Sequence, residues 1–115
     1  MSARSDIELE PSAVAERLAQ DPELQLIDVR EPYEHEAGHI PDTRLIALTA
    51  LSSQAGTLQQ ERPVIFYCRV GSRSLMAAQA FRASGFEAYS MAGGLLRWSD
   101  EGRALAPDGG RVADH

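Results

Sequence analysis

The sequence predicts an α/β domain built on a parallel sheet with helices on both faces. Short runs of apolar and β-branched residues, such as 63–67, alternate with segments whose apolar residues recur at helical spacing, such as 75–83. Glycine and proline separate many of these segments. Because strands that alternate with helices usually pair in parallel, this order favours a sheet covered on both sides. A length of 115 residues suits one such domain with a substantial core.

The first half of the chain is expected to supply three strands and three helical segments. Residues 1–6 are polar and expected to be flexible, and the domain is expected to span residues 7–105. Pro11 suits the first position of one helix, and Thr49 suits the N-cap of another. Gly38 is expected to end a helical turn. In order, we expect an edge strand at 7–9, a helix from 11 to 21, a strand at 24–29, a helical turn at 31–37, a strand at 45–48 and a helix at 49–58.

The second half is expected to contain the central strand and the helix that follows it. Met76, Ala77, Ala80 and Phe81 fall at helical spacing and are expected to form the face that packs on the sheet. From residue 106 to residue 115 the chain is expected to be a flexible polar tail. In order, we expect a strand at 63–67, a helix at 75–83 ended by Gly85, a strand at 86–91 and a short helix at 95–98 that packs Trp98 on the sheet.

The only cysteine lies in a loop between the strand at 63–67 and the helix that follows. Ligands bind at the carboxyl ends of parallel strands, where the next helix presents unpaired N–H groups. A cysteine placed there is expected to titrate below its free pKa of about 8.5, toward roughly 3.5 to 7.5. The loop therefore predicts an anion-binding site around a thiolate. It consists of Cys68, Arg69, Val70, Gly71, Ser72, Arg73 and Ser74.

Three residues of this loop have specific expected roles. Arg69 and Arg73 supply positive charge, and Gly71 lets the backbone turn its N–H groups inward. Arg73 is expected to contact a ligand at the mouth of the site more than to stabilise the fold. The alternative is an inert buried cysteine, which is the usual state of a lone intracellular cysteine. The polar neighbours of Cys68 favour reactivity, whereas a thiol packed away from solvent would favour the inert alternative.

Other polar residues are expected near the same edge of the sheet. Asp28 and Arg30 follow the strand at 24–29, and they reach the edge that carries Cys68 if the two strands are parallel. Asp28 is expected to be a buried acceptor that supports the loop backbone or pairs with an arginine. His35 is expected to be solvated and His39 to pack and hydrogen-bond, so neither is expected to act as a general base.

Composition excludes several classes of partner. The net charge of -6 argues against nucleic acid and anionic membranes, which favour a basic face. One cysteine cannot form an internal disulfide, and three scattered histidines predict no zinc site. No glycine-rich dinucleotide motif follows the first strands, so no cofactor is expected. Without a membrane-length apolar run or a signal-peptide core, a cytoplasmic location is expected.

Four segments, in order and over nearly the whole domain, make the sequence similar to the single-domain rhodaneses, which are sulfurtransferases. The resemblance implies a sheet of about five parallel strands. It also implies that Cys68 takes the outer sulfur of a small anionic donor such as thiosulfate and holds it as a persulfide. The acceptor would be cyanide, a thiol, or a redox or sulfur-acceptor protein. The segments are Leu26 to Glu31, Glu36 to Pro41, Cys68 to Ser74 and Gly93 to Trp98.

The sequence departs from the family pattern in two places. Asp42-Thr43 stands where a small Gly-Ala pair is common, which alters a surface turn more than the site. The loop at 69–72 only partly matches loops that use thiosulfate well, so the physiological donor stays open.

Two alternatives to sulfur transfer remain. Cysteine-based phosphatases and arsenate reductases also cradle an anion in a loop that ends in arginine. The phosphatases place one more residue between cysteine and arginine than the four between Cys68 and Arg73. A tighter ring suits a single sulfur atom better than phosphate. A sulfur carrier or regulatory module without turnover is the other alternative, although such inactive modules usually lack the cysteine.

Overall fold

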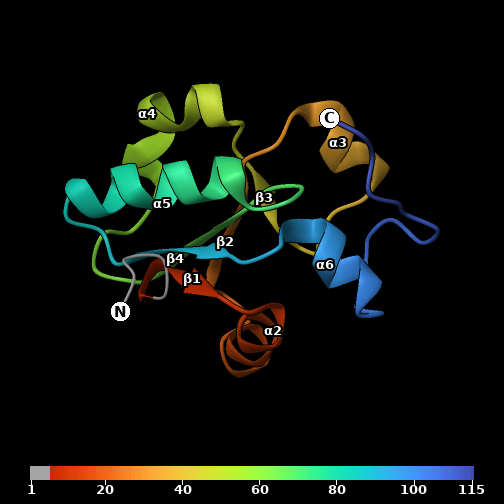
Figure 1. The fold of residues 1–115 in the computed structure, drawn as a ribbon. Coiled ribbons are helices and arrows are strands. Elements are labelled where there is room, and N and C mark those ends of the chain that lie inside the picture. Colours follow the sequence, from red (N-terminus) through yellow and green to blue (C-terminus); the bar gives the residue numbers. More distant parts are fainter. Residues whose placement is uncertain (1–5) are drawn as a thin grey trace.

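The computed structural model describes residues 6–115, which form a five-stranded parallel sheet with helices on both faces (Figure 1). This confirms the fold class expected from the sequence. The expected flexibility of residues 1–6 falls mostly on residues 1–5, which lie outside the described part of the chain. The strands are β1 (Glu8–Leu9), β2 (Gln25–Asp28), β3 (Arg44–Leu45), β4 (Val64–Tyr67) and β5 (Ala88–Met91). Their order across the sheet is β1-β5-β4-β2-β3, so β4 is central and β1 is an edge strand.

The helices divide between the two faces of the sheet. Figure 1 shows α4 and α5 on one face and α2 on the other. In the described region no helix is long and apolar enough to cross a membrane. The helices are α2 (Pro11–Gln20), α3 (Pro32–Ala37), α4 (Leu51–Gln54), α5 (Ser72–Ala83) and α6 (Gly94–Asp100), and 3-10 turns at Leu48–Ala50 and Ala55–Thr57 flank α4.

The central strand β4 is buried along its whole length, which explains its continuous apolar sequence. It pairs in parallel with β2 and with β5, and Asp28 lies opposite Tyr67 in the register. Parallel pairing brings the ends of β2 and β4 to one edge of the sheet, as the sequence predicts. The residues that follow these two strands, including Cys68 and Arg30, therefore lie near each other.

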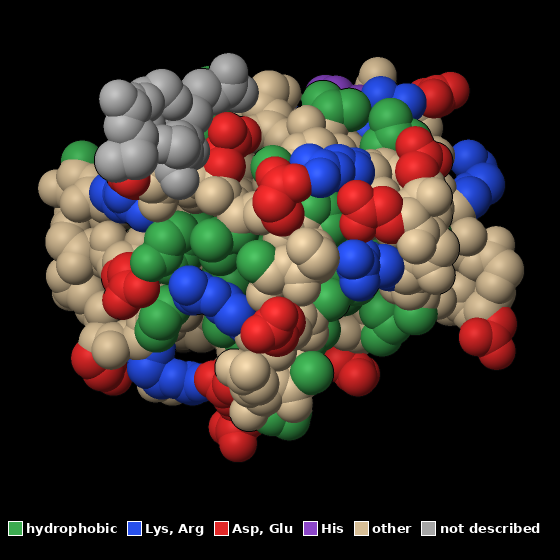
Figure 2. Space-filling view, turned by 60° about the horizontal axis from the view of Figure 1, so that its bottom comes forward, with side chains coloured by type: hydrophobic (Ala, Val, Ile, Leu, Met, Phe, Trp, Pro, Cys, Tyr) green, Lys and Arg blue, Asp and Glu red, His purple; other side chains and the backbone are tan. Residues whose placement is uncertain are grey.

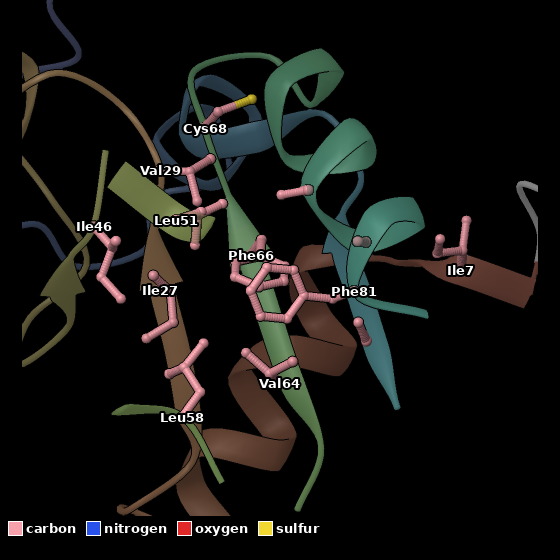
Figure 3. Packing of buried hydrophobic residues seen from close by; sticks show 13 residues of the cluster. Ile7, Ile27, Val29, Ile46, Leu51, Leu58, Val64, Phe66, Cys68 and Phe81 are labelled. Atoms are coloured by element: carbon pink, nitrogen blue, oxygen red, sulfur yellow. The ribbon is translucent and has the colours of Figure 1, made fainter. Parts of the chain in front are cut away.

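A separate apolar cluster covers each face of the sheet. On the α5 side, the rings of Phe66 and Phe81 meet edge to face, with centroids 4.9 Å apart (Figure 3). On the other side, Trp98 is buried as expected, and its indole N–H donates to the carbonyl of Ala104 at 2.9 Å. Figure 2 shows the face that carries α2, where acidic and basic side chains are interspersed with apolar ones.

Two helix predictions are wrong in detail. The segment 49–58 is a short helix between two 3-10 turns, and Thr49 lies within the first turn instead of capping a helix. One reason is that the N–H of Leu48 already bonds to the carbonyl of Val29 at 3.1 Å, which starts the turn before Thr49. Met76 does not belong to the buried face, because 57% of its surface is exposed. Ala80 is exposed as well, and the buried positions of α5 are Ser74, Ala77, Ala78 and Phe81.

Residues 106–115, expected to form a flexible tail, pack against the rest of the domain. Ala106 and His39 form an antiparallel bridge with N···O distances of 2.8 and 2.9 Å. The N–H of Arg111 donates to the carbonyl of Ala37 at 2.8 Å, and Ala113 is buried. The chain end therefore lies over α3, as Figure 1 shows.

Candidate active site

The site is the loop that joins β4 to α5. Cys68 follows the last residue of β4, and its sulfur points toward α5 (Figure 3). The Sγ accepts N–H groups from Gly71 at 3.1 Å and from Ser74 at 3.4 Å, and the hydroxyl of Ser74 lies 3.5 Å away. Such N–H groups stabilise a negatively charged sulfur more than a neutral thiol, because the interaction is charge-assisted.

A left-handed glycine lets the loop turn back on the sulfur. Gly71 has a φ of 109°, a conformation that costs a glycine little. It precedes α5, and its carbonyl accepts the N–H of Leu75 at 3.0 Å. In the described chain the N–H groups of Ser72 and Arg73 have no acceptor, as is usual for a first helical turn. The loop thus directs two amides to the sulfur and leaves two more free in the described chain, and the anion site expected from the sequence stays a prediction.

The first turn of α6 supports the loop from behind. The N–H of Leu95 donates to the carbonyl of Cys68 at 2.8 Å, and the N–H of Leu96 donates to that of Arg69 at 3.0 Å. Gly94 has a φ of 61°, and a Cβ there would lie 2.4 Å from the carbonyl oxygen of Arg69. The glycine pair before Leu95 therefore lets two backbones meet.

Cys68 is 0% exposed, which is the state that favours the inert alternative. An inert apolar cysteine, however, has no need of two amide donors. Cys68 also belongs to the apolar cluster on the α5 side of the sheet, so packed residues as well as the loop surround it. Val70, at the outer side of the loop, is 47% exposed.

Arg73 is held by a partner that sequence analysis missed. Its guanidinium donates to both carboxylate oxygens of Glu34, at 2.9 and 3.0 Å. Glu34 is buried in α3, so the pair links α3 to the loop. Burial raises the pKa of Glu34, but the hydrogen bonds from Arg73 and from the backbone of Glu31, together with the positive charge of Arg73, outweigh burial, and the pKa is lowered. The pKa of Arg73 is raised, chiefly by its hydrogen bond to Glu34.

This geometry changes the expected role of Arg73. A guanidinium that already binds a carboxylate with two hydrogen bonds stabilises the loop first, rather than standing free at the mouth of the site. The available sequence signal was the capping pattern of α3, in which Glu31 and Glu34 bond to each other's backbone N–H. That pattern identifies Glu34 as a residue of the first helical turn but does not predict that its carboxylate binds Arg73.

Arg69 is the more accessible loop arginine. Its side chain is 30% exposed, and its Nη2 lies 3.5 Å from the carboxylate of Asp114. Its buried Nε has no partner in the described chain. The exposed pair holds weakly, because water screens it. The structure therefore leaves Arg69, rather than Arg73, as the loop cation that can exchange its partner for a ligand.

Asp28 is the buried acceptor expected from the sequence. Its carboxylate binds the guanidinium of Arg30 at 2.9 and 2.7 Å and the backbone N–H of the same residue at 3.0 Å. Arg30 also donates to the carbonyl of Gly38 at 2.7 Å. Burial lowers the pKa of Arg30, but the hydrogen bond to Asp28 and the negative charge around the guanidinium together outweigh burial, and the pKa is raised. Neither side chain has a bond to Cys68 among the described contacts, so both support the edge of the sheet.

The prediction that the His35 side chain is solvated is wrong. Its Nδ1 lies 2.9 Å from the buried carboxylate of Asp28, and its ring stacks on that of His39 with centroids 3.8 Å apart. His39 packs and hydrogen-bonds as expected, through its Nδ1 and the carbonyl of His35 at 2.7 Å. The acidic neighbours of His35 in the sequence suggested a solvated side chain, whereas its partner Asp28 lies at the end of strand β2. Neither ring contacts the cysteine sulfur in the described contacts.

The turn at Asp42-Thr43 reaches further inward than expected. Thr43 Oγ1 lies 2.8 Å from the hydroxyl of the buried Tyr67, which also accepts the N–H of Ile40 at 3.1 Å. Burial raises the pKa of Tyr67 well above its usual value, so the phenol stays protonated. These bonds connect the turn to the end of β4, directly before Cys68.

The site can stabilise one negatively charged atom by hydrogen bonds. The amides of Gly71 and Ser74 bond to the sulfur, and Arg69 follows Cys68 in the same loop. Within residues 6–115 no group of three or more histidine, cysteine, aspartate or glutamate side chains is arranged to hold a metal ion. The chemistry suited to this arrangement is nucleophilic attack by Cys68 and storage of charge on its sulfur.

Comparison with known proteins places this fold and loop in a family. The family model for the rhodanese-like domain matches residues 10–101. The chain is 42% identical over 81 residues to the uncharacterized protein YqhL of Bacillus subtilis, with 70% of this chain and 64% of that protein covered. It is 33% identical over 94 residues to the putative sulfurtransferase YtwF of the same organism, with 82% of this chain and 91% of that protein covered.

A solved structure shows the same fold. The rhodanese-related protein of Thermoplasma volcanium superposes with a TM-score of 0.80 at 23% identity, with 87% of this chain and 97% of that chain covered. The sequence match covers most of the domain, including the site loop and its supporting glycines. The chain therefore belongs to the rhodanese-like domain family.

Proposed function

We propose that this protein is a sulfurtransferase that carries a sulfane sulfur on Cys68. The observation that supports this most is the pair of N–H bonds from Gly71 and Ser74 to the sulfur of the only cysteine. Sulfur transfer also agrees with the family and with a relative named as a putative sulfurtransferase. A compartment that keeps thiols reduced, such as the cytoplasm, suits this chemistry.

The reaction proceeds in two half-reactions. The Cys68 thiolate attacks the outer sulfur of thiosulfate, a new S–S bond forms, and the old S–S bond breaks as sulfite leaves with the electron pair. The enzyme then holds a persulfide whose negative charge lies on the terminal sulfur. An acceptor, cyanide or a thiolate, attacks that sulfur and restores the Cys68 thiolate. Cyanide leaves as thiocyanate, and no oxidant is needed. Two covalent states of the enzyme imply ping-pong kinetics.

The loop residues divide the work of binding. The amides of residues 69–74 receive the charge of the thiolate and then of the persulfide. Arg69 attracts the anionic donor, because its guanidinium is exchangeable, whereas Arg73 is occupied by Glu34. Because the sulfur is covered, each transfer requires a local movement that exposes it, and Val70 is the exposed residue of the loop where that movement can occur. Asp28 and Arg30 hold the neighbouring strand end in place.

A carrier or regulatory module without turnover is the second candidate. The observation that favours it is the complete burial of Cys68. Such a module would load sulfur slowly and release it only to one protein partner. The phosphatase alternative has weaker support, because the loop has only four residues between Cys68 and Arg73.

Intact-protein mass spectrometry tests the proposal. The protein is exposed to thiosulfate, weighed, then treated with cyanide and weighed again. We expect a gain of one sulfur atom that cyanide removes as thiocyanate, and no gain in Cys68→Ser. Unchanged mass with thiosulfate and with a small persulfide would overturn sulfur transfer. Loading without release to cyanide or small thiols would favour the carrier, and aryl phosphate turnover lost in Cys68→Ser would favour the phosphatase.

A further inference from the structure

The segment 106–114, here called the strap, is attached to α3 at several points. It bridges to His39 through Ala106, and the N–H of Arg111 bonds to the last residue of α3. Gly38 permits this approach, because a Cβ there would lie 2.2 Å from the carbonyl oxygen of Arg111. Burial of Ala113 fixes the segment just before Asp114.

The strap ends beside the active loop. The hydroxyl of Tyr33 donates to the backbone carbonyl of Asp114 at 3.3 Å. The carboxylate of Asp114 then lies 3.5 Å from Nη2 of Arg69, and its side chain is 100% exposed. The other loop arginine, Arg73, is paired with the buried Glu34. Both loop cations thus face a carboxylate, and only the one on Arg69 is surrounded by water.

We infer that Asp114 is a specificity-determining residue, which disfavours sulfur donors with two negative charges relative to donors with one. This inference rests on the proposed function for its substrate class. An anion that binds Arg69 must displace or tolerate the Asp114 carboxylate. The cost grows with the charge of the donor, so a dianion such as thiosulfate is disfavoured more than an alkyl persulfide, which carries one negative charge.

The size of the effect follows from the exposed position of the pair. If the Asp114 carboxylate lies about 6 Å from a bound donor in water, its repulsion slows the reaction of a monoanionic donor about threefold and that of a dianionic donor about tenfold. Salt screens exposed charges, since the Debye length falls from about 30 Å at 0.01 M to about 3 Å at 1 M. The discrimination should therefore be largest in dilute buffer and disappear in concentrated salt.

Alkylation of Cys68 tests this discrimination by Asp114 between reagents of different charge, here called the charge filter, without any sulfur donor. Iodoacetate and iodoacetamide are similar in size but differ by one negative charge. Any movement that exposes the thiol affects both rates equally, so the ratio of the two rates measures only the effect of charge. We expect Asp114→Asn to raise the iodoacetate-to-iodoacetamide ratio about threefold in about 10 mM salt. In about 1 M salt the ratio should equal that of the wild type. Asp108→Asn, the matched control, removes the same charge from an exposed strap residue with no such contact to Arg69, and should leave the ratio unchanged.

Turnover then connects the filter to the proposed function. We expect Asp114→Asn to raise kcat/KM about tenfold for thiosulfate, a dianion, and only about threefold for an alkyl persulfide, a monoanion, in dilute buffer. An alkylation ratio that stays the same, or that rises equally in Asp108→Asn, would overturn the role of Asp114 even if the protein transfers sulfur. A raised ratio in a protein that never gains sulfur would confirm the filter and overturn the proposed function. A thiol that reacts with neither reagent would overturn both.

Discussion

Replacing Arg73 by methionine should destabilise the fold more than it impairs donor use. The substitution keeps a long side chain but leaves the buried carboxylate of Glu34 without its two hydrogen bonds. Removing one partner of a buried ion pair costs about 3 to 5 kcal/mol, because the other charge stays buried and uncompensated. Arg73 is 17% exposed, so we expect the lower end, about 3 kcal/mol.

The loss should depend on pH in one direction. The pKa of Glu34 is lowered from 4.5 in the folded protein, so its pairing stabilises the fold fully above about pH 4.5 and is lost as the pH falls through the folded value. Protonation of Glu34 also relieves the variant of its unpaired charge. Burial without Arg73 raises the pKa of Glu34 in the variant, so the difference in unfolding free energy between wild type and Arg73→Met should begin to shrink above about pH 4.5 and continue to shrink below it.

Urea unfolding at several pH values measures this difference. At pH 7 we expect a loss of about 3 kcal/mol, which corresponds to a fall in Tm of about 12 °C for a domain of this size. Glu34→Gln in the Arg73→Met background should recover part of the loss, since it removes the charge. The control is Arg62→Met, which breaks the exposed pair with Asp21 and should cost at most about 1 kcal/mol. Near-wild-type stability of Arg73→Met at pH 7, combined with a large rise in KM for thiosulfate, would refute this reasoning and restore Arg73 to the mouth of the site.

Three further substitutions test the support of the loop. Gly94→Ala should lower the free energy of unfolding by more than about 2 kcal/mol and slow sulfur loading, because its Cβ would collide with the loop backbone. Gly102→Ala has a similar φ of 78° in open space, so it should cost only about 1 kcal/mol; equal losses would contradict the close contact. Ser74→Ala should slow sulfur loading about fivefold to tenfold, with a stability loss near 1 kcal/mol, and unchanged loading would remove its hydroxyl from the site. Tyr67→Phe should cost about 1 to 3 kcal/mol in urea unfolding, because the buried N–H of Ile40 loses its acceptor; a neutral result would show that the amide finds another partner.

The sequence predicted the parts of the fold that depend on local patterns. The apolar run before Cys68 identifies a fully buried strand, and Pro11 at the start of α2 identifies a helix that begins where it was expected. The position of the cysteine loop followed from the same patterns, because a loop between a strand and a helix of a parallel sheet can only lie at one edge. Asp28 was predicted to be a buried acceptor because it follows the apolar residues of a strand in the same sheet.

Helix boundaries and buried faces were predicted less well where tertiary contacts override local preference. The hydrogen bond from Leu48 to Val29, the residue after β2, starts a turn that the N-cap preference of Thr49 would have delayed. Met76 lies on the exposed side of α5 because the helix begins at Ser72 and turns Ser74 and Ala77 toward the sheet. Helical spacing alone cannot tell which of two neighbouring faces of a helix is buried when their residues are offset by one position in the sequence.

The sequence by itself determined that this protein is a single α/β domain with one cysteine in an amide-rich loop. Only the tertiary structure decided that the thiol is covered, that Arg73 is paired with Glu34 and that Asp114 lies beside Arg69. The partners in these two contacts stand 39 and 45 residues apart, so no periodicity or short motif links them. Local sequence sets which backbone groups surround the sulfur, whereas the charge that a ligand meets there depends on segments that folding brings together.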